Sequence, residues 1–282
     1  MSYLGKKGYS IYKKDLTNKE QIYIKTELTV KPYLPKSPIQ PESFPLYRES
    51  PQKMYLPRHF GVEHFGDVTE NKLPLGDDIH LDFAGELREY QVNIVNKYVK
   101  AVGDSGGGLL DVDPGKGKTV MALNIISKLK KKALVIVHKS FLLNQWKNRI
   151  EQFLPKARVG IVQGTVTDVH DKDIVIGMLQ SLSLKDDYPD DLFDDIGTII
   201  FDECHHLSAE KFSQILQKIS VPYMIGLSGT PKRADKLDCV LEYHIGKMLY
   251  YEEPQINQEI FVSIYKFTIK HKNFAIVLNK YT

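Results

Sequence analysis

A glycine-rich loop near the middle of the chain carries the residue types that bind phosphate. It lies in the segment LLDVDPGKGKTV, and its candidate nucleotide-binding residues are Gly115, Lys116, Gly117, Lys118, Thr119 and Val120. Backbone N–H groups of such a loop wrap a phosphate, and the positive end of the following helix faces the same group. Lys118 is expected to reach the β- and γ-phosphates of a nucleotide, and the Thr119 hydroxyl to ligate Mg²⁺. The competing interpretation is a plain glycine-rich turn, since Val112 stands where the usual pattern has a glycine.

A pair of adjacent carboxylates follows a second apolar run, in the segment TIIFDECHHL. An α/β sheet binds its ligands at the carboxyl ends of its strands, which is where this run would deliver Asp202 and Glu203. Asp202 suits Mg²⁺, and Glu203 suits the orientation and deprotonation of an attacking water. With Lys118, they are the predicted catalytic residues. A zinc site at His205 and His206 is disfavoured, because no cysteine pair or third ligand lies in register.

Polar residues also follow three other apolar runs: Lys139 and Ser140, Gln180 and Ser181, and Ser228 and Thr230. The first two pairs offer a cation, hydroxyls and an amide to the phosphate backbone of a nucleic acid. The third pair can hydrogen-bond both toward the carboxylates and toward a nucleic acid. The alternatives are helix capping by Ser181 and a polar turn before Pro231.

A regular alternation of strands and helices is expected to position these residues. Apolar runs at 109–112, 133–137, 173–177, 198–201 and 223–227 are typical of parallel strands covered on both faces. Helices are predicted at Val120–Lys131, Phe141–Phe153 and Ala209–Ile219. Strand, helix, strand repetition gives an α/β fold with a parallel sheet and right-handed crossovers. Trp146 falls at a core-facing position of the second helix, which favours packing over base stacking.

The first 86 residues have a different character. Twelve basic and twelve acidic residues make them neutral, and seven of the 14 prolines of the chain lie between Pro32 and Pro57. Proline disfavours helices and central strands there. The preceding segment QIYIKTELTV is rich in β-branched and aromatic residues, which predicts a strand or hairpin arm. We therefore expect a small β-containing accessory region.

Composition narrows the class of protein without defining its function. The chain has 282 residues, of which 42% are hydrophobic and 26% charged, which argues against wholesale disorder. No apolar run is long enough for a membrane span, and no secretory signal is visible. The only cysteines, Cys204 and Cys239, exclude a disulfide scaffold, so an intracellular location is expected. The net charge is +3, so any basic surface for nucleic acid must be local.

Six segments in order resemble the motifs of superfamily 2 helicases and translocases, nearest the DExH branch with XPB, phage UvsW and helicases of large DNA viruses. They are LREYQ, DPGKGKT, ALVIVHKSFLLNQW, DIVIGMLQSL, DECHH and GLSGTPKRAD, and they span about residues 87–251. The resemblance implies a RecA-like P-loop NTPase fold that uses ATP and Mg²⁺. It implies that Gln91 contacts adenine and that Ser228 and Thr230 couple the two sites. The implied substrate is DNA, with RNA as the alternative, and transcription or repair machinery are implied partners.

The same resemblance implies a division of the chain. We expect an accessory domain or arm at 1–86, a RecA-like lobe at 87–251 and the start of an interlobe connection at 252–282. Helicases of this superfamily hold ATP between two such lobes, and an arginine of the second is worth about 10³ to 10⁵ in rate. No Q-x-x-G-R-x-x-R-like element follows Pro254. A second lobe is therefore an expected partner, and the isolated chain is expected to hydrolyse little ATP.

Two functions remain open at this point. The first is an ATP-dependent helicase or translocase, and the second is a non-catalytic regulatory module that binds ATP and nucleic acid. A small-molecule kinase fits poorly, because it offers no account of DECHH followed by SGTP.

Overall fold

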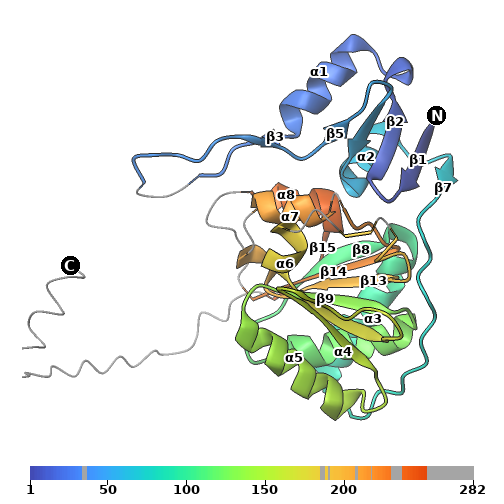
Figure 1. Ribbon diagram of the computed structural model, residues 1–282, viewed down its shortest axis with the longest axis vertical. Coiled ribbons are helices and arrows are strands. Elements are labelled where there is room, and N and C mark those ends of the chain that lie inside the picture. Colours follow the sequence, from blue (N-terminus) through green and yellow to red (C-terminus); the bar gives the residue numbers. More distant parts are fainter. Residues whose placement is uncertain are drawn as a thin grey trace, which may run out of the picture. The chain divides into compact units, whose positions relative to one another are not determined.

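The computed structural model describes residues 1–33, 37–184, 188–189, 191–206, 209–216, 218–229 and 237–252. The residues up to 71 contain a five-stranded sheet, and those from residue 107 onward contain an eight-stranded sheet (Figure 1). A short two-stranded ladder, β3–β4, adjoins the first sheet in sequence. Within the described ranges, no helix has the length and apolar character that crossing a membrane requires.

The N-terminal sheet has the strand order β5-β6-β2-β1-β7. Its region contains β1 (Ser2–Gly5), β2 (Gly8–Tyr12), the 3₁₀ helix η1 (Lys13–Asp15), α1 (Asn18–Glu27), β3 (Thr29–Val30), β4 (Phe44–Pro45), β5 (Arg48–Glu49), β6 (Lys53–Leu56), α2 (Arg58–Phe65) and β7 (Glu70–Asn71). One face of the sheet, which includes Tyr9, Ile11 and Met54, is buried against the helices. On that face, Gly61 of α2 lies directly against the Tyr9 ring.

The predicted strand at QIYIKTELTV is wrong, because most of this segment forms helix α1. A capping box starts the helix: the Thr17 N–H donates to Glu20 Oε2 at 2.7 Å, and the Glu20 N–H donates to Thr17 Oγ1 at 3.2 Å. Ile24 and Leu28, four residues apart, are fully buried in the N-terminal core. Capping and packing thus outweigh the local β-propensity, and only Thr29–Val30 is extended.

The second sheet has the order β11-β10-β12-β9-β13-β14-β8-β15, and every neighbouring pair is parallel except β10 and β11. Its elements are α3 (Glu89–Ser105), β8 (Gly107–Asp111), α4 (Lys118–Leu129), β9 (Ala133–Val137), α5 (Ser140–Phe153), β10 (Val159–Gln163), β11 (Val166–Thr167), β12 (Ile174–Met178), α6 (Leu179–Leu184), β13 (Thr198–Phe201), the 3₁₀ helix η2 (Cys204–His206), α7 (Ala209–Leu216), β14 (Tyr223–Ser228), α8 (Asp238–Ile245) and β15 (Met248–Tyr251). The predicted α/β fold with a parallel sheet is confirmed.

Helices cover both faces of this sheet, so its central strands are buried throughout. One core contains side chains of α3, α4 and α5, and the other contains side chains of α7 and α8. Successive residues of β9 alternate between the two cores, which explains the uninterrupted apolar run ALVIV. Trp146 of α5 is 1% exposed, as predicted for a core residue.

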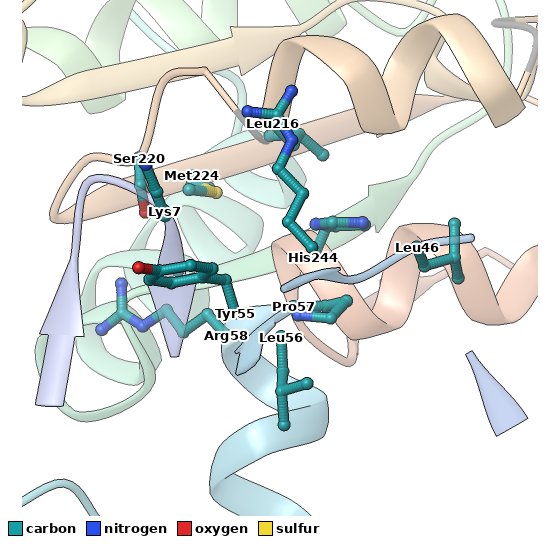
Figure 2. Close-up of a pocket in the computed structure, with 12 residues that line it drawn as sticks. Lys7, Leu46, Tyr55, Leu56, Pro57, Arg58, Leu216, Ser220, Met224 and His244 are labelled. Atoms are coloured by element: carbon teal, nitrogen blue, oxygen red, sulfur yellow. The ribbon is translucent and has the colours of Figure 1, made fainter. Parts of the chain in front are cut away.

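The N-terminal region packs on the lobe through α2 and α8. The Arg58 guanidinium donates to the Pro222 carbonyl at 3.0 Å, and the Phe60 and Tyr243 rings meet edge to face with centroids 5.0 Å apart. A cavity of about 10 Å³ lies at this junction. Figure 2 shows Tyr55 and Met224 among the side chains that line it. A space of that size holds no more than one water, so the junction is closely packed.

The segment between the two sheets, residues 74–84, forms a strap along the amino ends of the strands of the lobe. The Asp77 N–H donates to the Asp195 carbonyl at 2.7 Å, and the Asp77 carbonyl accepts from the Lys132 N–H at 2.9 Å. The Ile79 N–H donates to the Lys130 carbonyl at 3.0 Å. Residues 130–132 directly precede β9, and Asp195 lies three positions before β13, so the strap is bonded near the start of both strands.

Candidate functional site

The glycine-rich loop joins β8 to α4 and turns back on itself at two glycines. Gly115 has φ 82° and Gly117 has φ 84°, in the left-handed region that glycine adopts without strain. A Cβ at Gly117 would lie 2.5 Å from Gln91 Nε2, so a side chain there would displace the Gln91 amide in addition to straining the backbone. Helix α4 begins at Lys118, and its amino terminus therefore faces the loop. The loop is built as a phosphate-binding loop requires.

Lys118 and Glu203 form an ion pair across the loop. The Lys118 ammonium lies 3.4 Å from Glu203 Oε1 and donates to the Val112 carbonyl at 3.1 Å. The Lys118 side chain is 9% exposed, and that of Glu203 is 26% exposed. Glu203 has φ 51°, a strained backbone for a residue other than glycine, and this turn follows the end of β13 directly. Two predicted catalytic residues from distant parts of the sequence thus lie in contact.

Asp202 is buried behind this pair. Its Oδ2 accepts a 2.8 Å hydrogen bond from the indole N–H of Trp146, whose helix α5 packs beside the site. Burial raises the pKa of Asp202, and the bond from Trp146 opposes that rise. The carboxylate is therefore held in place by a donor that fixes one of its two oxygens.

A cavity of about 240 Å³ lies over these side chains. Its lining comes from the loop, α4, α5 and the acidic pair: Pro114, Gly115, Gly117, Lys118, Thr119, Val120, Leu142, Gln145, Arg149, Asp202 and Glu203. Sequence reasoning missed the contribution of α5. The signal was present, because Leu142, Gln145 and Arg149 recur at the three- to four-residue spacing of one helix face.

Gln91 lies against the loop, with both ends of its amide engaged inside the protein. Its Nε2 donates to the Lys116 carbonyl at 2.9 Å, and its Oε1 accepts from the Arg88 N–H at 3.0 Å. The Tyr90 hydroxyl donates to the same Lys116 carbonyl at 3.0 Å. Gln91 is 5% exposed, so it supports the loop in this arrangement and would have to change partners to contact a base.

Lys116 of the loop contacts Glu252, a carboxylate at the end of the edge strand β15. Its ammonium is ion-paired with Glu252, which follows β15, and lies 3.6 Å from Asp113. Glu252 Oε2 also accepts from the Asp113 N–H at 3.2 Å. The loop is thereby tied to the edge strand, a contact that sequence reasoning did not identify.

The predicted nucleic-acid residues lie at the carboxyl ends of β9 and β12, which are neighbours in the sheet. Gln180 Nε2 donates to the His138 carbonyl at 3.0 Å, which brings Gln180 beside Lys139 and Ser140. Lys139 and Ser140 are exposed. Ser181 has a different partner: its Oγ accepts a hydrogen bond from the Gly164 N–H at 2.8 Å.

The coupling residues are only partly described. Ser228, at the end of β14, is 5% exposed, and its Oγ lies 3.1 Å from His205 Nδ1. His205 Nδ1 lies 3.5 Å from Glu203 Oε2, which links Ser228 to the acidic pair through one imidazole. Thr230 lies outside the described residues. Within the part of the chain that the structure describes, no group of three or more His, Cys, Asp or Glu is arranged to hold a metal.

The fold and the site together define a class. A parallel sheet with a glycine-rich phosphate loop after one strand and an acidic pair after another is a RecA-like P-loop NTPase lobe. A family model described as "Type III restriction enzyme, res subunit" matches residues 84–233. The match spans more than half of the chain, so the chain belongs to this family.

Relatives and solved structures agree with this assignment. A protein of Acanthamoeba polyphaga mimivirus, L396, named as an ATP-dependent RNA helicase, is 35% identical over 94% of this chain and 52% of its own length. The DNA 3'-5' translocase XPB2 of Sulfurisphaera tokodaii is 32% identical over 58% of this chain and 35% of its own length. The UvsW helicase of bacteriophage T4 shares the fold, with a TM-score of 0.60 at 14% identity over 89% of this chain and 99% of that one. The chain spans about half the length of the mimivirus relative.

Proposed function

We propose that this chain carries the ATP-binding lobe of a helicase or translocase that acts on DNA. The proposal rests on the ion pair between Lys118 and Glu203, which lies beside Asp202 in the cavity lined by the glycine-rich loop. A similar relative is named a DNA translocase, whereas the mimivirus relative is named for RNA, so RNA is the alternative substrate.

In the proposed reaction, the loop N–H groups and Lys118 bind the phosphates of ATP, and Gln91 lies on the adenine side. Thr119 and Asp202 would hold Mg²⁺, which neutralises phosphate charge when bound. The site suits this ion, because Mg²⁺ takes oxygen ligands and keeps several waters alongside one or two protein groups. Glu203 is the proposed base that orients the attacking water. The Lys118 ion pair must open for this, since it occupies the same carboxylate.

The nucleic-acid track is proposed to lie over Lys139, Ser140, Gln180 and Ser181. The bond from Gln180 to His138 supports a shared surface for the first three. Ser228 and Thr230 are the proposed link to the ATP site, supported by the Ser228–His205–Glu203 chain of contacts.

We also propose the division into 1–86, 87–251 and 252–282, and a second RecA-like lobe as the partner that completes the site. Residues 253–282 lie outside the described residues. The two sheets support the first boundary, and the coverage of about half of the mimivirus relative is compatible with a second lobe. An intracellular location and a link to transcription or repair machinery remain proposals.

The proposal is tested with the purified chain and a fluorescent ATP analogue. We expect Mg²⁺-dependent binding that Lys118→Ala weakens, and little hydrolysis without a second lobe. Strong ATPase activity of residues 1–282 that nucleic acid stimulates would contradict the need for that lobe. Restoration of hydrolysis by a longer chain with intact Glu203, but not with Glu203→Gln, would separate a motor from a non-catalytic regulatory module.

A further inference from the structure

The N-terminal sheet has one face that α1 and α2 do not bury, and tyrosines and lysines fill it. Strand register places Tyr3, Ser10, Tyr55 and Arg48 in one row across β1, β2, β6 and β5. Tyr12 and Lys53 form the next row on the same side. The opposite side carries the buried residues Tyr9 and Ile11, so the two faces differ sharply.

Each tyrosine on this face has a lysine over its ring. The ammonium of Lys53 lies 4.9 Å from the Tyr3 centroid and 4.6 Å from the Tyr12 centroid. The remaining contacts pair Lys72 with Tyr3 at 4.9 Å, Lys7 with Tyr55 at 5.1 Å and Lys14 with Tyr12 at 5.5 Å. Figure 2 shows Tyr55 among the side chains that line the cavity at the junction with the lobe.

The charge of this face is one-sided. Four lysines lie over its rings: Lys7, Lys14, Lys53 and Lys72. Arg48, in the same row, lines the cavity at the junction with the lobe, together with Lys7 and Tyr55. Strand pairing also places Glu70 of β7 opposite Tyr3, and its carboxylate forms an ion pair with Lys72 at 2.9 Å. The first 86 residues are neutral as a whole, so this is a local excess and not a property of the region.

We propose that this tyrosine–lysine face binds single-stranded nucleic acid, with bases stacked on the tyrosine rings and phosphates on the lysines. Aromatic rings interleaved with cations on a sheet suit unpaired bases, because every base has a π-face to stack. A duplex keeps those faces inside its own stack and offers only base edges in its grooves. Tyr3 and Tyr55 flank Ser10, at roughly 10 Å from strand to strand, and Ser10 is 1% exposed between them, so the two rings cover the row.

The lysines would change partners on binding. In the free protein they cover the rings, and Lys53 also donates to the Tyr3 hydroxyl at 3.1 Å. A phosphate offers a stronger, charged acceptor, so the ammonium groups move to the strand and the rings become available to bases. This site lies outside the nucleotide-binding lobe, and its occupation does not require ATP.

The test uses the chain 1–282 without nucleotide and fluorescein-labelled oligo-dT and oligo-U of about 20 nucleotides. We expect Tyr12→Leu to weaken binding about tenfold and Tyr12→Phe to leave it nearly unchanged, since the phenyl ring keeps the stacking surface. Lys53→Gln should lower the slope of log affinity against log salt by about 1. Tyr23→Leu and Lys19→Gln, on the exposed side of α1, are the matched controls.

A second measurement covers variants that fold poorly. Oligonucleotides with photoreactive thiouridine should crosslink the unmodified chain at Tyr3, Tyr12 or Tyr55, as mapped by peptide mass spectrometry. Crosslinks confined to the lobe, or Tyr12→Leu binding as well as the unmodified chain, would overturn the proposal. The proposal would also be overturned if a blunt duplex bound as tightly as the single strand and if Tyr12→Leu did not weaken that duplex binding. Such a result would mean that the face binds phosphates only.

The outcome is separable from that of the proposed motor function. The same titrations in Lys118→Ala and Lys139→Ala backgrounds should retain the dependence on Tyr12. If the ATP-site assignment fails, this dependence persists. If the tyrosine–lysine face fails, ATP binding by the lobe is unchanged.

Discussion

The indole N–H of Trp146 donates a 2.8 Å hydrogen bond to Oδ2 of Asp202, although the two residues are 56 positions apart. The only tryptophan of the chain is therefore both a core side chain and a positioning group for the proposed magnesium ligand. The bond leaves Oδ1 as the carboxylate oxygen not held by the indole.

Trp146→Phe should keep most of the packing and remove this donor. Loss of a bond to a buried charged group is expected to lower the free energy of unfolding by about 1.5–3 kcal/mol. It should also raise the pKa of Asp202 further, so Mg²⁺-dependent ATP binding should fail at a higher pH than in the unmodified chain. Tyr98→Phe removes a comparable buried donor, to the Met224 carbonyl at 2.8 Å. If Trp146→Phe and Tyr98→Phe show the same pH dependence of Mg²⁺-dependent ATP binding, the positioning role of Trp146 is contradicted.

Asp202→Asn should stabilise the fold at neutral pH while it removes function. Burial raises the pKa of Asp202 in the folded protein, so the stability linked to its protonated form is lost as pH rises through that value. The asparagine variant should therefore melt above the unmodified chain at pH 7, and the difference should vanish at acidic pH. Hydrolysis by a two-lobe chain should fall about 100-fold or more. Melting curves across pH check the first point, and a lower melting temperature at pH 7 would refute it.

Lys118→Ala should weaken ATP binding about 10- to 100-fold, because a hydrogen bond to a charged phosphate is worth about 1.5–3 kcal/mol. Binding of nucleic acid should be unaffected. Titration of a fluorescent ATP analogue measures the first effect. Lys128→Ala, on the same helix but bonded to Asn96, is the control and should bind ATP normally.

Lys139→Ala should weaken binding of nucleic acid to the lobe and reduce the salt slope by about 1, with ATP binding intact. Gln180→Ala should weaken it too, since its bond to the His138 carbonyl holds the two loops together. Anisotropy titrations at several salt concentrations give both values. The assignment fails if both variants match Lys147→Ala, an exposed lysine farther along α5.

Acid should loosen the junction between the N-terminal region and the lobe. Burial, with the nearby Arg58 charge, lowers the pKa of His59 to about 4. A lowered pKa gives stability that is present above the unfolded value and lost as pH falls through the folded one. Between about pH 6.5 and 4, up to about 3 kcal/mol should be lost at this residue. His59→Asn should flatten that part of the stability curve, whereas His80→Asn, at an exposed position, should not.

Sequence predicted the lobe well because its signals are local and repeated. The bounds of β9 and β13 match the predicted runs, and Lys118 of the loop lies in contact with Glu203 of the acidic pair. The N-terminal helix α1 was missed because a capping box and two buried contacts outweighed propensity. The Trp146 bond and the Glu252 contact join residues far apart in sequence, and no single-sequence pattern encodes such pairs. The α5 lining was missed, although its spacing on one helix face was visible in the sequence.

The strap of residues 74–84 has a mechanical consequence. Its backbone is hydrogen-bonded to residues 130 and 132, just before β9, and to residue 195, three positions before β13. The strap is therefore attached to the lobe at the amino ends of both strands. The far ends of those two strands lead to Lys139 and to Asp202. The strap therefore holds the amino ends of the two strands whose carboxyl ends carry the proposed nucleic-acid track and the acidic pair.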